Sequence, residues 1–305
     1  MAITRRELGS LALGSFSLGV SEAKAATFAG ATDCHVHIIG PSSKYPMVTN
    51  RPYTPPEASV AALKAMHAKL GISRTVLVQP SFYGTDNSCM LDALAQLGTS
   101  ARGVAVVAPN VSEQTLQDLD VKGVRGIRIN LESAGNRDPK AAGALLTTYA
   151  KKVAPLNWHI QIYTVEPVIA KLVQQIADMT VPVVVDHFGM PVPPDGWKAA
   201  EVLVDLAHAR KVYVKLSAPY RFSKPSDYKD VTTFARTLIY AARDHMLWGS
   251  DWPHTQQIPG HPAGEITPFS KIDDAAIFDL FNSWYPDETT RKMILVDNPA
   301  KLYRF

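Results

Sequence analysis

Short runs of apolar, often β-branched residues recur along the chain, and longer stretches with helical spacing of apolar residues separate them. Several runs are almost continuously apolar, which is typical of parallel strands buried on both faces. The predicted strands are Ala31–Ile38, Thr75–Gln79, Gly103–Val107, Gly126–Asn130, His159–Tyr163, Val183–His187, Val212–Ser217 and Met246–Asp251. Strands and helices that alternate in this way indicate the α/β class.

Helical patterns follow most of these strands. They cover Ser59–Leu70, Cys89–Leu97, Asp138–Lys152, Pro167–Met179, Trp197–Arg210 and Ser226–Arg243, with a shorter pattern at Ser112–Leu119 and closing helices at Asp287–Leu295 and Asn298–Tyr303. Eight strands with a helix after most of them predict a (β/α)8 TIM barrel. Without an internal repeat or linker, residues 27–305 are expected to form a single domain. The proline-rich stretches Tyr45–Pro56 and Ile258–Pro268 are predicted to be ordered loops over the active face.

The first residues resemble an export signal. Arg5 and Arg6 precede a weakly apolar run of about 13 residues and an A-K-A motif, and such a run is too short to span a bilayer comfortably. We interpret residues 1–26 as a twin-arginine signal with cleavage near Ala25 or Ala26, which predicts a periplasmic protein. A retained amphipathic helix is the alternative, and a cryptic signal would leave the protein in the cytoplasm.

Composition narrows the partners. With 46% hydrophobic and 19% charged residues, the chain is an ordinary globular protein. A net charge of +3 is too small to favour nucleic acid, and no membrane partner is expected beyond the export signal. Cys34 and Cys89 form no disulfide framework, and Cys34 is expected to be buried within its strand.

Residues with catalytic chemistry follow three of the predicted strands. His35 and His37 end the first strand, His187 follows Asp186 at the end of the sixth, and Asp251 ends the eighth. Residues i and i+2 of a strand share a face, so both first-strand imidazoles should point into the barrel. Catalytic groups of TIM barrels lie at the strand C-termini, so these side chains should meet there.

Each candidate has an expected role. Asp251 is the predicted general base that takes a proton from water, while His35, His37 and His187 would polarise a carbonyl and stabilise the oxyanion, directly or through a metal. His254 is expected either to reach the same pocket or only to orient the turn before it.

Arg128 on the fourth strand alternates with isoleucines, so its side chain should point inward. A buried arginine is costly unless it is paired with an anion, which suggests a ligand carboxylate or sulfonate held in a bidentate way.

Five motifs carry a specific resemblance: D-C-H-V-H-I-I-G-P, V-L-V-Q-P-S-F-Y-G-T-D-N, G-V-R-G-I-R-I-N, V-V-V-D-H-F-G and L-W-G-S-D-W-P-H. They resemble the amidohydrolase-related TIM barrels, most closely the 2-pyrone-4,6-dicarboxylate hydrolases and 4-sulfomuconolactone hydrolases, from Thr32 to Tyr303. The resemblance implies hydrolysis of a small anionic lactone in aromatic catabolism.

The resemblance also implies substrate contacts. Arg221, Tyr53, Ser81 and Tyr163 match positions that bind substrate in those hydrolases, although Arg221 and Tyr53 could instead be solvated loop residues. One place departs from the pattern.

Where the dicarboxylate hydrolases have a second arginine soon after the fourth strand, this chain has Glu132, Ser133 and Ala134, with Arg137 further along. The departure leaves the identity of the lactone open, and a second anionic group of another kind, as in the sulfonated muconolactone, fits the resemblance too.

Metal use is a separate question. In the superfamily that the chain resembles, a binuclear site needs a bridging acid or carboxylated lysine on the fourth strand and a histidine on the fifth. At the ends of these strands the chain has Asn130 and Tyr163, so a binuclear site is not expected. A mononuclear zinc has acceptable ligands in His35, His37, His187 and Asp251. The pyrone hydrolases that the chain resembles work without metal, which favours no obligatory cofactor, with one zinc as the alternative.

Other functions remain open at this stage. A zinc-dependent decarboxylase or amide hydrolase could use the same barrel, whereas a related lactone isomerase has asparagine where this chain has Asp251. A periplasmic solute-binding protein would leave that carboxylate without a purpose. The resemblance is compatible with a monomer or a small homo-oligomer.

Overall fold

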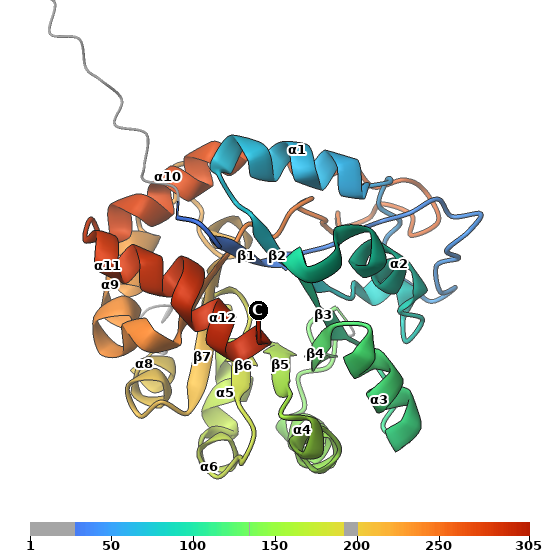
Figure 1. Ribbon diagram of the computed structural model, residues 1–305, viewed down its shortest axis with the longest axis horizontal. Coiled ribbons are helices and arrows are strands. Elements are labelled where there is room, and N and C mark those ends of the chain that lie inside the picture. Colours follow the sequence, from blue (N-terminus) through green and yellow to red (C-terminus); the bar gives the residue numbers. More distant parts are fainter. Residues whose placement is uncertain (1–27, 134, 192–200) are drawn as a thin grey trace, which may run out of the picture.

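The computed structural model describes residues 28–133, 135–191 and 201–305, which fold around eight parallel strands that neighbour one another in chain order (Figure 1). The strands are β1 Thr32–Val36, β2 Arg74–Val78, β3 Ala101–Ala105, β4 Val124–Asn130, β5 His159–Tyr163, β6 Val183–Val185, β7 Val212–Ser217 and β8 Met246–Gly249. All eight fall within or beside the predicted runs.

Backbone bonds between the first and last strands close the ring. The Asp251 amide donates to the His35 carbonyl at 2.9 Å, and the His37 amide donates to the Trp252 carbonyl at 2.9 Å. Gly249 permits this close approach, since a Cβ there would lie 2.8 Å from the His35 Cβ. The predicted (β/α)8 barrel is therefore confirmed.

Helices surround the barrel (Figure 1). They are α1 Val60–Leu70, α2 Ser88–Leu97, α3 Glu113–Val121, α4 Pro139–Val153, α5 Glu166–Lys171, α6 Val173–Ala177, α8 Glu201–His208, α9 Val231–Ala242, α10 Asp274–Trp284, α11 Glu288–Lys292 and α12 Asn298–Tyr303. Their apolar faces pack on the sheet, as at Leu63, Leu146 and Leu238, which are fully buried. No helix in the described ranges is long and apolar enough to cross a membrane.

The helix predictions differ from the structure in detail. The pattern over Pro167–Met179 forms two short helices, because the backbone at Leu172 leaves the helical conformation. The predicted helix Trp197–Arg210 begins outside the described residues, and α8 is its described part. Helix α10 was not predicted from the sequence, although the side chain of Asp273 caps its N-terminus by accepting hydrogen bonds from the amides of Ala275 and Ala276.

Buried side chains fill the interior of the barrel at the N-terminal end of its strands. Cys34, Val76, Val104 and Leu247 form a buried cluster with Tyr303 of α12, which plugs the N-terminal end. Cys34 is fully buried as expected, and both cysteines are free. Because this end is packed with side chains, the open space lies at the strand C-termini.

Two loops meet over that C-terminal end. Thr54 pairs with Ile266 in a short parallel bridge, and the Thr267 amide donates to the Thr54 carbonyl at 2.7 Å. The two proline-rich stretches are thus ordered, as predicted, and this bridge joins them to each other. Pro52 and Tyr53 of the first stretch line the space above the barrel.

Candidate active site

Two of the side chains with catalytic chemistry lie just past the C-terminal ends of their strands. β6 ends at Val185 and β8 at Gly249, so His187 and Asp251 lie two residues past the sheet. Both residues have positive φ, 50° and 63° respectively. A non-glycine residue in this conformation costs about 1–2 kcal/mol, and such strain tends to occur at functional sites. The sharp turns aim both side chains across the barrel mouth.

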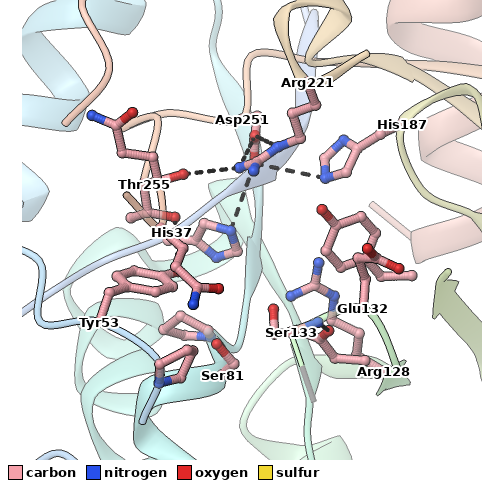
Figure 2. Close-up of a pocket in the computed structure, with 16 residues that line it drawn as sticks. His37, Tyr53, Ser81, Arg128, Glu132, Ser133, His187, Arg221, Asp251 and Thr255 are labelled. Atoms are coloured by element: carbon pink, nitrogen blue, oxygen red, sulfur yellow. Dashed lines mark hydrogen bonds and ion pairs between the residues drawn. The ribbon is translucent and has the colours of Figure 1, made fainter. Parts of the chain in front are cut away.

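Three imidazoles converge on one carboxylate oxygen (Figure 2 shows two of them). From Oδ1 of Asp251, the Nε2 atoms of His35, His37 and His187 lie 3.6, 3.7 and 3.9 Å away. This oxygen has no hydrogen-bond partner among the described residues, and neither has His35 Nε2. The first-strand histidines therefore share a side, as their spacing predicts, and surround Asp251 with ring nitrogens.

The other nitrogen of each ring is anchored. His37 Nδ1 lies 2.7 Å from the Val78 carbonyl, which can only accept, so this nitrogen carries a hydrogen, and Nε2 has the lone pair in the neutral tautomer of the ring. His187 Nδ1 lies 2.8 Å from the Ser217 hydroxyl, which can donate or accept. Burial lowers the pKa of His187 to about 3, so its ring is neutral at neutral pH.

The second oxygen of Asp251 is held by cations and a hydroxyl. Oδ2 accepts from the Tyr220 hydroxyl at 2.7 Å and from Nε and Nη2 of Arg221 at 2.8 and 2.6 Å. Burial alone would raise the pKa of Asp251, but Arg221 and the nearby histidines hold that pKa well below its usual range. Asp251 is thus a carboxylate with one oxygen fixed and one facing the histidines.

A second buried carboxylate lies beneath. Asp186 Oδ2 accepts from Arg128 Nε at 3.2 Å and Gln161 Nε2 at 3.0 Å, and Oδ1 lies 3.3 Å from His35 Nδ1 and 3.6 Å from Lys215 Nζ. The Lys215 ammonium also donates to Gln161 Oε1 at 2.6 Å. All these side chains are almost fully buried. They form a polar layer that supports His35 from below.

This layer corrects one inference from the sequence. Arg128 was expected to need a ligand anion to compensate for its burial, but Asp186 supplies that anion within the protein. Arg128 nevertheless lines the pocket, and its guanidinium lies 5.1 Å from the ring centre of Tyr163. Its burial alone therefore does not require an acidic ligand.

Asp251 lies at one side of a pocket whose lining residues come from several strand ends and loops (Figure 2). Eight of the ten predicted site residues line it: His37, Tyr53, Ser81, Arg128, Tyr163, His187, Arg221 and Asp251. The remaining lining consists of Pro52, Pro80, Asn130, Glu132, Ser133, Thr255, Gln256 and Gln257. Tyr53 donates to the Thr255 hydroxyl at 3.1 Å.

Two predicted site residues lie outside this lining. His35 is completely buried beneath Asp251, so it acts on the pocket through that carboxylate. His254 contacts Asp274 Oδ1 through Nε2 at 3.0 Å and the Tyr220 hydroxyl through Nδ1 at 3.2 Å. The structure thus places the His254 ring outside the lining, where it contacts Tyr220 and Asp274, and the substrate contact stays a prediction.

Several residues that support the candidate site were not predicted from the sequence. Tyr220 directly precedes Arg221, and Gln161 stands two positions before Tyr163, a spacing that puts both on the same face of β5. Asp33 accepts from the Ser250 amide at 2.9 Å and also from its hydroxyl. It thereby fixes the residue before Asp251. Ser250 is 217 positions away along the chain, so local patterns could not reveal this contact.

One group of side chains can hold a metal. Among the residues that the structure describes, donor atoms of His35, His187 and Asp251 lie within 4.8 Å of one another, and no second group is found there. Nitrogen and carboxylate ligands of this kind suit a single zinc ion, and two of the donor atoms have no other partner. The residues present thus fit one ion.

Comparison with known proteins agrees with this site. The family model described as "Amidohydrolase" matches residues 32–305. The chain is 35% identical to a 2-pyrone-4,6-dicarboxylate hydrolase of Comamonas testosteroni over 90% of both chains. It is 32% identical to a 4-sulfomuconolactone hydrolase of Hydrogenophaga intermedia, with 90% of this chain and 88% of that one covered.

A solved structure from Acinetobacter baumannii, assigned as a 2-pyrone-4,6-dicarboxylic acid hydrolase and holding citric acid, has 26% identity and a TM-score of 0.77. The match covers 91% of this chain and 100% of that one. The family match spans the whole described barrel, including every residue that lines the pocket. The chain therefore belongs to the amidohydrolase family.

Proposed function

We propose that this protein hydrolyses a small lactone that bears an anionic group, of the muconolactone or pyrone-carboxylate type, from aromatic catabolism. The observation that carries the proposal is Asp251 Oδ1: an unpartnered oxygen of an ionised carboxylate that lines the pocket, surrounded by three histidines. The relatives named above are hydrolases of such lactones. The proposed enzyme is thus a lactonase, acting on a carboxylic ester bond.

The base chemistry follows from the two oxygens of Asp251. Arg221 and Tyr220 hold Oδ2, so Oδ1 takes the proton from water while the water oxygen bonds to the ring carbonyl carbon. The neutral His37 ring has a lone pair at Nε2, which accepts a hydrogen bond from the second O–H group of that water. This hydrogen bond orients the water for attack. This contact is an alternative to the oxyanion contact expected from the sequence, because the Val78 carbonyl holds the hydrogen of a neutral His37 ring at Nδ1.

Oxyanion stabilisation falls to other groups. If the Ser217 hydroxyl donates to Nδ1 of His187, Nε2 carries a hydrogen and can donate to the developing oxyanion. When the tetrahedral intermediate collapses, the ring C–O bond breaks, and the proton held by Asp251 passes to the leaving oxygen. The product is an open-chain acid.

Two arginines provide the anion site. Arg221 uses Nε and Nη2 for Asp251, and Arg128 uses Nε and Nη2 for Asp186. A guanidinium has five N–H donors, so each keeps donors for a ligand carboxylate. Tyr163, Ser81 and Tyr53 add aromatic and hydroxyl groups to the same lining.

We further propose that hydrolysis needs no obligatory metal. The buried carboxylates Asp186 and Asp251 are already compensated by Arg128, Lys215 and Arg221. A divalent ion would add positive charge to a buried cluster whose carboxylates are paired. If one zinc is used instead, His35, His187 and Asp251 would hold it, with His37 beside them. When bound, zinc would lower the pKa of a coordinated water and polarise a carbonyl.

The test is turnover of a lactone panel by the purified mature chain, with and without a chelator, together with metal analysis. The panel includes 4-sulfomuconolactone, 2-pyrone-4,6-dicarboxylate and lactones with a single anionic group. We expect hydrolysis of at least one of its members at a rate that chelation leaves within about twofold, because Asp251 supplies the base. Loss on chelation and recovery with zinc would contradict the metal-independent mechanism. No turnover of any lactone by a zinc-containing protein would favour a decarboxylase or amide hydrolase.

We also propose that residues 1–26, which lie outside the described residues, direct twin-arginine export and are removed near Ala25 or Ala26. The paired Arg5 and Arg6 ahead of a weakly apolar run support this. The mature protein would then act in the periplasm. Mass spectrometry of the protein recovered from a periplasmic extract should find an N-terminus there, whereas an intact N-terminus in the cytoplasm would contradict export.

A further inference from the structure

Glu132 introduces a negative charge into a pocket that otherwise suits anions. It lies two residues after β4 and lines the pocket beside Ser133 and Arg128, with Tyr53 and Thr255 on the other side (Figure 2). Its Oε1 accepts from Arg137, whose side chain is 60% exposed. Its Oε2 is covered from solvent and has no hydrogen-bond partner in the described part of the chain.

Backbone hydrogen bonds hold the loop that carries Glu132. The amides of Leu131 and Glu132 both donate to the Tyr163 carbonyl, at 3.0 and 3.3 Å, which ties the loop to the tip of β5. The Asn136 amide donates to the Leu131 carbonyl at 2.9 Å and the Ser133 amide to Asn130 Oδ1 at 3.0 Å. Glu132 thus stands on a tight turn anchored to the barrel.

Charge balance in the pocket limits the ligand. The charged residues that line it, among those described, are two arginines, Arg128 and Arg221, and two carboxylates, Glu132 and Asp251. Both arginines already pair with internal aspartates. A ligand with one anionic group can use the remaining arginine donors, but a second anion near Glu132 would meet repulsion. A buried acceptor without a partner instead calls for a donor.

We propose that Glu132 is a specificity-determining residue that selects a lactone with a single anionic group and a hydrogen-bond donor, such as a hydroxyl, on the side of β4. This inference rests on the proposed function only in taking the ligand to be a lactone, because the selectivity itself is a property of binding. The donor of the ligand would bond to the Glu132 carboxylate, whose side chain is 21% exposed at the pocket. A ring that carries a second carboxylate, or a sulfonate beside its carboxylate, would be disfavoured.

Unreactive ring acids can test this selectivity without turnover. Calorimetry would compare three ring acids that share one carboxylate. 3-Hydroxybenzoate adds a hydroxyl donor, benzoate adds no second group, and isophthalate adds a second carboxylate. We expect the wild type to bind 3-hydroxybenzoate at least ~10-fold more tightly than isophthalate, because a bond to an ionised acceptor is strong and like charges repel. Glu132→Gln should reduce that ratio to about 1–2, since the amide is neutral and can also donate.

Arg137→Ala is the matched control. It removes the exposed partner of Oε1 and leaves Oε2 in place, so the preference for 3-hydroxybenzoate should persist. The inference would be overturned if the wild type bound 3-hydroxybenzoate and isophthalate with equal affinity, or did not measurably bind 3-hydroxybenzoate. An unchanged ratio of the two affinities in Glu132→Gln would also overturn it. Since lactone turnover is measured separately, a failure of the proposed function would leave this binding result standing, and the two failures can be told apart.

Discussion

Asp251→Asn should reduce kcat/KM for the lactone substrate by at least ~10²-fold, because an amide cannot take the proton from water. The structure makes this expectation specific to one oxygen. Oδ1 faces His35, His37 and His187 without a hydrogen-bond partner of its own, whereas Oδ2 is occupied by Tyr220 and Arg221. Steady-state kinetics on any lactone that the wild type hydrolyses would measure the loss.

The matched control is Asp227→Asn, which removes a carboxylate that is 51% exposed and pairs with Lys229 at the surface. That variant should keep wild-type kinetics. Thermal unfolding of both variants separates lost chemistry from lost folding. A folded Asp251→Asn protein that retains more than about a tenth of wild-type activity would show that another group is the base.

Arg128→Met should lower the free energy of unfolding by about 3 kcal/mol, since removing one partner of a buried ion pair leaves the other charge uncompensated. Arg128 Nη2 lies 3.1 Å from Asp186 Oδ2, and both side chains are at least 96% buried. Methionine keeps much of the volume of the side chain but none of its donors. Lys215 and Gln161 stay near Asp186 and limit the loss. Urea unfolding would measure it.

Arg210→Met provides the comparison at the surface. Arg210 pairs with Asp244 at 2.8 Å, but the two side chains are 43% and 46% exposed. Exposed pairs contribute about 0–1 kcal/mol, so this variant should be nearly as stable as the wild type. If the two arginine variants lose equal stability, the buried layer beneath the histidines does not support the fold as its contacts suggest.

Much of this architecture was predictable because its signals are local. Continuous apolar runs such as Val183–Val185 predict parallel strands wherever they occur, since only burial on both faces tolerates them. The two-residue spacing of His35 and His37 determines that they share a side of β1. The placement of Asp251 at the end of the last strand follows from the order of elements, since parallel strands of a barrel present their C-termini at one end.

Other features depended on contacts between distant segments. The charge of Arg128 is balanced by Asp186, 58 positions later, so its inward-pointing side chain looked like a ligand site from the sequence. His254 was assigned to the pocket by its proximity to Asp251, but its φ of 65° turns the chain and Asp274 holds its ring away from the lining.

The sequence by itself therefore determined the barrel, the order of its strands and the residue types at its mouth, because these depend on periodicity and strand direction. Only the tertiary structure decided which charges neutralise one another and which oxygen of Asp251 stays free. It also placed Glu132 in the pocket lining. Such pairings depend on distances of a few ångströms between residues far apart in the chain, and no local pattern of side chains encodes those distances.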